Sequence, residues 1–307
     1  MTLEVSGWTD VGDCVSIGVI ADHVNCCGCM EGSMSVAMRP CLCVVGRVVA
    51  GLAMALLVAL GPALAQTHDP APPGLRVGTF ADNPPWEFRE QGDLTGFDID
   101  LMKAVAARMD VAVEFVDMPF AQLFTALAEG RIDAAICSIT VTPERRQHFE
   151  FTQPYYQTSQ GVAAMKRARL RSLADLAGKR VGAEAGSTNE QWLADNRARY
   201  GFGPTVTSTG LDAAMEELRE GRIDAYFGDL PALLFRLLEQ TDLSVMMRLP
   251  TNDQYAIALP SNSPLSSRMD AALAEIKKDG TLVAIHQRWF GMKPEPDSPV
   301  TTVLPRP

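Results

Sequence analysis

A seven-residue segment that occurs twice constrains the fold of this chain more than any other feature. Residues 128–134 read Ala-Glu-Gly-Arg-Ile-Asp-Ala, and residues 219–225 differ from them only at the first position. Each copy follows an amphipathic helical pattern, places a glycine where that helix should end, and leads into an apolar run typical of a strand. A common helix-to-strand turn could recur by chance, but near identity in equivalent contexts favours two lobes of similar construction.

The pattern around these copies predicts an α/β fold. From Leu75 onward, short runs rich in β-branched residues alternate with helical patterns, which predicts mostly parallel sheets flanked by helices in each lobe. Residues 75–79 and 111–116 are expected to be strands, and residues 98–109 carry one apolar stripe typical of a helix. These three segments form a βαβ unit.

Two apolar extended segments are expected to carry the chain between the lobes. We interpret residues 160–165 and 253–259 as a two-strand hinge. The first lobe then comprises residues 75–162 and 256–292, and the second comprises residues 163–255. Residues 293–307 are rich in proline and have no periodicity, so a disordered tail is predicted.

The N-terminal part of the chain has the three parts of a secretory signal. Arg39 and Arg47 are followed by an apolar run and by Ala63-Leu64-Ala65, which predicts cleavage after Ala65. Residues 1–65 are therefore expected to be a leader, and the mature protein is expected in the periplasm. A membrane anchor is the alternative, but the apolar run is short for a bilayer span of about 20 residues. The acidic segment that precedes the signal is unlike a leader, so we expect translation to start at Met34 or Met38.

Cysteine usage and charge exclude several functional classes. Of the 7 cysteines only Cys137 lies beyond the leader, so the mature protein cannot form an internal disulfide. The Cys26-Cys27-x-Cys29 cluster has no histidine or cysteine pair at zinc-finger spacing, so we expect no metal and no other cofactor. A formal net charge of −10 is not typical of nucleic-acid binding.

The two copies of the repeat also indicate where a ligand would bind. In open α/β sheets, ligands bind at the carboxyl ends of the strands. In the first copy that position holds Ser138, and in the second it holds Asp229, each at the same distance from the aspartate of the repeat. We therefore expect both residues on facing edges of a cleft between the lobes.

An arginine near a predicted helix start points to a bound anion. Thr142 is placed as the N-cap of this helix and Pro143 as its first residue. Arg145 then falls in the first turn, where the helix dipole disfavours a cation, so an anionic ligand would explain it. The alternative is an exposed side chain that pairs with Glu144 in solvent.

The second lobe offers a matching loop at residues 186–190. Ser187 and Glu190 have the spacing of a capping box, so Glu190 is interpreted as a cap rather than an acid catalyst. Asp229 could be the counter-charge for an ammonium group. Arg145 in one lobe and Asp229 in the other would then bind the two ends of a zwitterion, and closure of the lobes would be coupled to binding.

Several motifs together resemble a known family, the bacterial extracellular solute-binding proteins of family 3, which bind polar amino acids. The resemblance covers residues 75–292 and rests on Gly78-Thr79, Pro84-Pro85-Trp86-Glu87-Phe88, Gly96-Phe97-Asp98-Ile99-Asp100-Leu101, the stretch from Ser138 to Arg145, and Phe227-Gly228-Asp229. It implies a two-lobed fold like that of type II periplasmic binding proteins, shared with ligand cores of ionotropic glutamate receptors. It further implies a monomeric, non-enzymatic protein that delivers an L-amino acid to an ABC transporter permease in the inner membrane.

The resemblance also implies a role for each site residue. Arg145 should bind the α-carboxylate and Asp229 the α-ammonium group. The other implied contacts come from Ser138, Thr140, Ser187, Thr188 and the ring of Phe120. Asp98 and Asp100 fall in a helix-start motif of the family and receive no ligand role.

Three positions depart from the family pattern. Phe80 and Asn83 stand at ligand-binding positions where an acidic or polar residue and an aromatic residue are common, and Cys137 replaces a small hydroxyl residue. The missing acid at position 80 argues against a basic amino acid, and Asn83 could bond a polar side chain. We therefore expect a neutral polar or an acidic amino acid as the ligand.

Two other functions are compatible with the same fold. A dehydratase of the cyclohexadienyl type, acting on prephenate or arogenate, would need a general acid three residues beyond Asp229, where this chain has Ala232. Glu190 is the only substitute that the sequence suggests. A ligand-sensing module is the second alternative.

Overall fold

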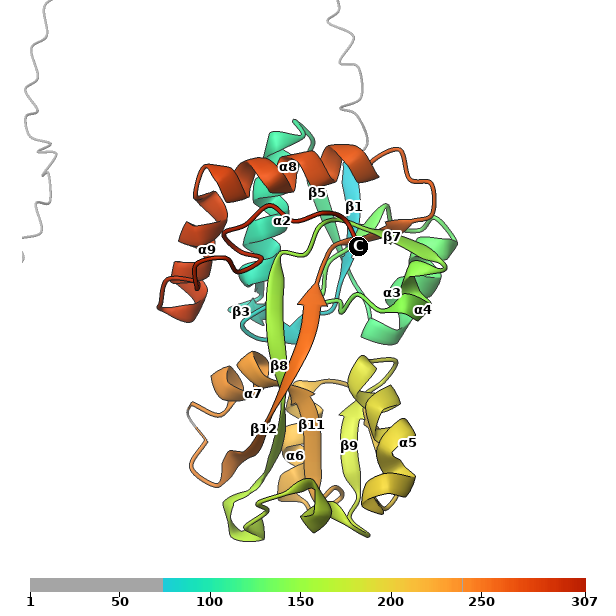
Figure 1. Ribbon diagram of the computed structural model, residues 1–307, viewed down its shortest axis with the longest axis vertical. Coiled ribbons are helices and arrows are strands. Elements are labelled where there is room, and N and C mark those ends of the chain that lie inside the picture. The colour runs from blue at the N-terminus through green and yellow to red at the C-terminus, as the bar shows by residue number, and fades with distance from the viewer. Residues whose placement is uncertain (1–73, 239) are drawn as a thin grey trace, which may run out of the picture. The chain divides into compact units, whose positions relative to one another are not determined.

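Two five-stranded β-sheets form the centres of two lobes, which Figure 1 shows one above the other. The computed structural model describes residues 74–307 with the exception of residue 239. These residues belong to one compact unit. The predicted leader at residues 1–65, its cleavage after Ala65 and the start sites Met34 and Met38 lie outside the described residues.

The first lobe is a sheet in the order β5-β1-β6-β13-β7. Its strands are β1 (Leu75–Thr79), β5 (Val113–Asp117), β6 (Ala134–Ala135), β7 (Phe149–Phe151) and β13 (Ala258–Pro260), and a small sheet adds β2 (Asp82–Asn83), β3 (Glu87–Glu90) and β4 (Asp93–Thr95). The helices are α2 (Phe97–Arg108), α3 (Phe120–Ala128), α4 (Pro143–Arg146), α8 (Ser266–Lys278) and α9 (Thr281–Phe290). Adjacent residues of β6 point into different clusters: Ala134 joins the core that includes α2 and α8, and Ala135 joins the core that includes α3.

The second lobe repeats this plan with the order β10-β9-β11-β8-β12. The strands are β8 (Tyr156–Met165), β9 (Val181–Glu184), β10 (Thr205–Ser208), β11 (Ala225–Asp229) and β12 (Leu243–Tyr255). The helices are α5 (Thr188–Tyr200), α6 (Leu211–Arg219) and α7 (Leu230–Arg236), with short 3-10 turns at Lys166–Ala168 and Leu173–Leu176. Alternation again places Val162 with α5 and Ala163 with α6. Among the described residues, no helix has both the length and the apolar character needed to cross a membrane.

The seven-residue repeat has the same structural role in both lobes. Its glycine follows a helix, and its isoleucine packs so tightly on a glycine of the neighbouring strand that a Cβ there would clash, as Ile132 does on Gly78 and Ile223 on Gly182. Its aspartate receives both the backbone N–H and the guanidinium of an arginine at the start of that strand. These pairs are Arg76 with Asp133, at 2.7 Å, and Arg180 with Asp224, at 3.1 Å.

The sheets differ from the prediction in one respect, because they are mixed rather than mostly parallel. In each sheet two pairings are parallel and two are antiparallel. The antiparallel strands are those next to the two crossings between lobes. A strand that enters directly from the other lobe, without a crossover helix, runs against its neighbours.

The hinge consists of β8 and β12, which pair along their length from Tyr156 with Tyr255 to Met165 with Leu243. Figure 1 shows both strands running from one lobe into the other. The chain leaves the first sheet after Phe151 and re-enters it at Ala258. The predicted first crossing at residue 162 therefore falls inside β8, since an apolar strand does not show where it changes sheets.

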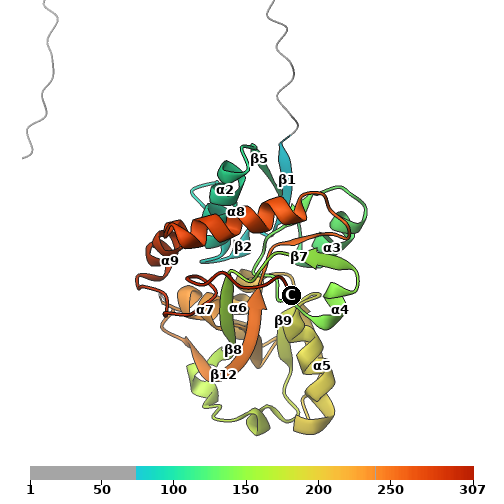
Figure 2. The ribbon, with the colours of Figure 1, turned by 45° about the horizontal axis from the view of Figure 1, so that its top comes forward.

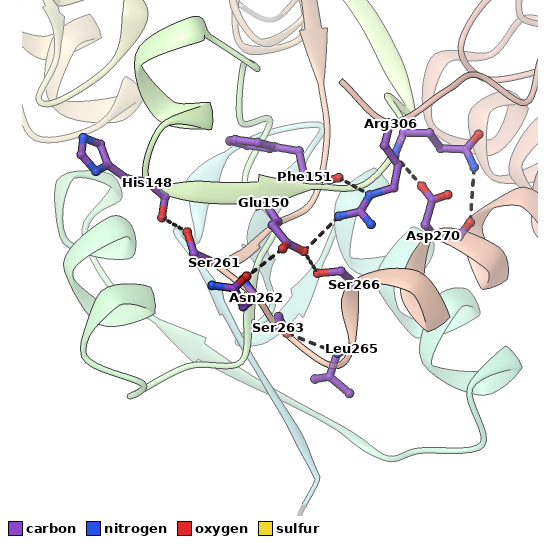
Figure 3. Close-up of polar contacts among 11 residues, drawn as sticks. His148, Glu150, Phe151, Ser261, Asn262, Ser263, Leu265, Ser266, Asp270 and Arg306 are labelled. Atoms are coloured by element: carbon purple, nitrogen blue, oxygen red, sulfur yellow. Dashed lines mark hydrogen bonds and ion pairs between the residues drawn. The ribbon is translucent and has the colours of Figure 1, made fainter.

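The C-terminal tail is packed against the first lobe, so the prediction of a disordered tail at residues 293–307 is wrong. Val300 is 2% exposed. The ammonium group of Lys277 donates to the Thr302 carbonyl at 3.1 Å, and the Arg306 guanidinium reaches the Phe151 carbonyl and the Glu150 carboxylate. Figure 3 shows the contacts of Arg306, and Figure 2 shows the tail running across the front of the molecule. These contacts are long-range, and local periodicity does not report them.

Packing of the tail can be tested with two matched valines. Val300→Ala should lower the free energy of unfolding by about 1–3 kcal/mol, because it removes buried methyl groups. Val303, which is 42% exposed, should tolerate alanine with a change below about 0.5 kcal/mol. Denaturant unfolding of both variants measures the difference. Equal effects would mean that the tail does not pack in solution.

Candidate functional site

A cavity lies between the two lobes at the carboxyl ends of their parallel strands. The cavity has a volume of about 50 Å³ and is partly open to solvent. With one exception the predicted binding residues line it: Asn83, Phe120, Ser138, Thr140, Arg145, Ser187, Thr188 and Asp229. The exception is Phe80, which packs on the core that includes α3 and approaches Gly210 of the second lobe.

Arg145 is held in the cavity wall by neutral groups. Thr142, the N-cap of α4, accepts a hydrogen bond from the Arg145 backbone N–H at 3.1 Å, as predicted. The guanidinium donates to the carbonyl of Thr140 at 2.8 Å and to that of Gly186, in the second lobe, at 3.3 Å. It also lies 4.7 Å from the centre of the Phe124 ring, at cation–π distance.

No carboxylate in the described part of the chain forms an ion pair with this guanidinium. The alternative of a solvent-exposed pair with Glu144 is therefore wrong. Burial lowers the pKa of Arg145 to about 10, which still leaves it charged at neutral pH. A partly buried cation without a counter-ion is costly, and an anionic ligand would offset that cost.

The loop before α5 brings the second lobe to this guanidinium. Ser187 accepts the Glu190 N–H at 3.1 Å, and Glu190 accepts the Gly186 N–H at 2.8 Å, which confirms Glu190 as a capping residue. Gly186 has a φ of 72°, which favours glycine. A Cβ on Gly186 would lie only 3.3 Å from Ala121 of the first lobe, so glycine also permits the close approach.

Asp229 joins the first lobe, the second lobe and both hinge strands. Its carboxylate accepts hydrogen bonds from Nε1 of Trp86 at 2.7 Å, from the hydroxyl of Thr158 on β8 at 2.7 Å, and from the hydroxyl of Tyr255 on β12 at 2.6 Å. It also caps α7 through the Ala232 N–H at 3.2 Å. Burial raises the pKa of Asp229, and these hydrogen bonds oppose the shift. The orientation of this carboxylate is thus set by the protein itself.

Two buried acids support Asn83 and Ser138 from behind the cavity wall. Asn83 donates to the Ser138 hydroxyl at 3.0 Å and to Glu87 at 2.9 Å. Asp98 accepts the Ser138 N–H at 2.7 Å. Ser138 has a φ of 42°. Burial and the neighbouring Asp98 raise the pKa of Glu87 well above its ordinary value, and burial raises that of Asp98 to about 6. Glu87 therefore keeps its proton to a higher pH than an exposed glutamate does.

Neither aspartate of the Gly96–Leu101 motif lines the cavity. Asp98 is buried, and Asp100 pairs with Arg288 at 3.0 Å and accepts from Nε1 of Trp289 at 2.9 Å. Both aspartates therefore bind other residues of the first lobe, in which α2 packs against α9.

Two further carboxylates line the cavity, and none of the sequence motifs indicated them. They are Asp82 on β2 and Glu184, the last residue of β9. Burial raises the pKa of Asp82 to about 6 and that of Glu184 to about 8. Glu184 ends a parallel strand, so the rule that indicated Asp229 would also have indicated Glu184.

A hinged pair of lobes that meet on a charged cavity defines a two-lobed solute-binding protein. Residues 75–292 match the bacterial extracellular solute-binding proteins, family 3, and the chain belongs to that family. The resemblance inferred from the motifs is thereby confirmed, and the solved structures below confirm the fold class.

Individual relatives and solved structures agree with this assignment. ABC transporter arginine-binding protein 1 of Escherichia coli (strain K12) is 35% identical over 70% of this chain and 90% of its own length. The L-cystine-binding protein TcyJ of the same strain is 31% identical over 71% of this chain and 82% of its own length. Among solved structures, an ancestral arginine-binding protein bound to arginine matches with a TM-score of 0.68 and 37% identity, over 71% of this chain and 98% of that one.

The state of Glu87 can be tested by the pH dependence of stability. An unfolded glutamate ionises near pH 4.3, whereas folded Glu87 keeps its proton to higher pH. The stability that this group contributes is thus full below about pH 4.3 and is lost as the pH rises toward its folded-state pKa. Glu87→Gln should remove this loss, so the variant should gain stability relative to the native protein between pH 5 and 7, by at most about 1.4 kcal/mol per pH unit.

Urea unfolding at several pH values measures this difference. The exposed Glu114 supplies the control, since Glu114→Gln makes the same chemical change at the surface of the protein. A parallel profile for Glu87→Gln would show that Glu87 is ionised in the folded protein.

Proposed function

We propose that this chain captures an L-amino acid between its lobes in the periplasm and delivers it to the permease of an ABC transporter. The observation that carries the proposal is the guanidinium of Arg145, which lines the cavity and lacks a carboxylate partner among the described residues. In this proposal the ligand carboxylate binds Arg145, and its ammonium group binds beside Asp229. The hydroxyls of Ser138, Thr140, Ser187 and Thr188 supply further hydrogen bonds.

Contacts from both lobes support a coupling between binding and closure. Arg145 belongs to the first lobe and already reaches the Gly186 carbonyl of the second. A carboxylate bound there would also lie near the N-terminus of α5, where free N–H groups and the helix dipole favour an anion. A ligand that contacts both lobes stabilises the closed arrangement over an open one.

Family membership supports the remaining parts of the proposal. The matched family is extracellular, and relatives named above include an arginine-binding protein of an ABC transporter and a cystine-binding protein. The predicted leader agrees with export to the periplasm. We propose that the protein acts there as a monomer whose protein partner is the permease.

The enzymatic alternative has one candidate acid, because the raised pKa of Glu184 would suit a general acid. Three points weigh against it. Position 232 holds a buried alanine, Glu190 is committed to its cap, and prephenate carries two carboxylates. The cavity offers such a dianion one guanidinium and three carboxyl groups. Formation of phenylpyruvate from prephenate by the purified protein would establish the enzyme, and no turnover is expected.

The role of Arg145 can be tested with its neighbour as a matched control. Arg145→Ala should weaken binding of the preferred L-amino acid by at least about 100-fold, because it removes a charge-assisted hydrogen bond from a partly buried site. Arg146, which is exposed on the same helix, should tolerate alanine without a change in affinity. Thermal-shift screening against the common L-amino acids identifies the ligand, and titration calorimetry then measures both variants.

Circular dichroism should show that both arginine variants are folded. If no amino acid stabilises the native protein at millimolar concentration, the proposed function is wrong. Retention of affinity in Arg145→Ala would instead contradict the assigned role of this residue.

A further inference from the structure

The charged groups that line the cavity do not balance for a simple zwitterion. They are one guanidinium, Arg145, and three carboxyl groups, Asp82, Glu184 and Asp229. A zwitterion with a neutral side chain would use Arg145 and one carboxylate. Two acidic groups would remain. Asp82 has the Arg236 guanidinium nearby, whereas Glu184 has no ion-pair partner among the described residues.

Glu184 differs from Asp229 in the hydrogen bonds that its carboxyl group receives. Asp229 accepts four hydrogen bonds from the protein. The side chain of Glu184 receives none from the described residues, although it lies at the cavity surface on the end of β9. Its backbone carbonyl accepts the Ser187 hydroxyl at 2.7 Å and the Ser187 N–H at 3.2 Å. A carboxyl group left in this state is available for a ligand.

Asp82 reaches the same cavity from the first lobe. It contacts the start of α6, where its carboxylate accepts the Asp212 N–H at 3.4 Å, a long hydrogen bond. Its negative charge is one cause of the raised pKa of Glu184, after burial. Two acids from opposite lobes thus line the same cavity and repel each other, and a cation bound beside them would relieve this repulsion.

We propose that Glu184, with Asp82, selects ligands whose side chain ends in a cation, and that Glu184 gives up a proton to solvent when the cation binds. This inference rests on the proposed function and adds the ligand class to it. It reverses the expectation of a neutral or acidic ligand, which considered only Phe80 and Asn83. The arginine-binding relatives are consistent with it.

Proton exchange follows from the surroundings of Glu184. The groups that face it are Asp82 from β2, Tyr226 from β11, Cys137 beyond β6, and Arg145 across the cavity. Burial raises the pKa values of Tyr226 and Cys137, so both stay neutral at pH 7. With its own pKa near 8, the empty site holds Glu184 mostly protonated at pH 7, and a ligand cation favours the ionised form.

The sign of the pH dependence is therefore defined. Since the cation binds the ionised carboxylate, affinity should rise as the pH increases toward 8, by at most about tenfold per pH unit for one proton. A ligand with a neutral side chain should show no such rise.

Arginine and citrulline provide a matched pair of ligands for the test. They share length and shape, but citrulline has a neutral ureido group in place of the guanidinium group. Calorimetric titration at pH 7 should show arginine binding at least about 30-fold more tightly than citrulline. Glu184→Gln should weaken the affinity for arginine by about 30-fold and change the affinity for citrulline by less than about threefold. Glu216→Gln, an exposed position in the same lobe, controls for net charge.

Titration in phosphate and in Tris, whose ionisation enthalpies differ, counts the proton. The native protein should release about one proton per arginine at pH 7, and Glu184→Gln should release none. If citrulline, glutamine or an acidic amino acid binds as well as arginine, the inference is wrong while the proposed function stands. If arginine is preferred without proton release, the proposed loss of a proton from Glu184 is wrong. If no amino acid binds, both proposals fail.

Discussion

The carboxylate of Asp229 is the contact on which the arrangement of the two lobes depends. It is one residue in the second lobe, yet its hydrogen bonds come from Trp86 in the first lobe and from Thr158 and Tyr255 on the two hinge strands. Separation of the lobes would leave the fully buried Trp86 indole without this acceptor, at a cost of about 1–3 kcal/mol. The carboxylate that would bind a ligand ammonium group therefore also holds the two lobes together.

Much of the fold could be predicted because one local solution is used twice. The repeat marks a helix end that leads into a strand, which is a local feature of sequence, whereas its aspartate binds an arginine that lies 57 residues away in the first lobe and 44 residues away in the second. The recurrence of the repeat predicted two lobes, and the strand ends beyond its two copies located Ser138 and Asp229. The capping signals at Thr142 and Ser187 were equally local, and both were correct.

The features that could not be predicted depend on residues far apart in the chain. The antiparallel half of each sheet follows from where the chain crosses between lobes, and an apolar strand such as β8 does not reveal that point. The tail is ordered because Lys277 and Gln153, both buried, bind its backbone. Low periodicity in the tail itself gave no sign of these partners.

The side-chain end of the cavity shows why a family pattern is an incomplete guide to specificity. The pattern directs attention to position 80, where the acid is absent, and that absence suggests a ligand without a basic group. The structure places the acidic side chains two residues later and on the opposite lobe, at Asp82 and Glu184. The electrostatic field in a cavity depends on all the charges that line it. An acid at one strand end can therefore have the same effect on a ligand as an acid at another. The number of acids that can line the site is then limited by the negative charge that the empty cavity can hold. The raised pKa of Glu184 indicates that a proton keeps this charge low until a cation binds.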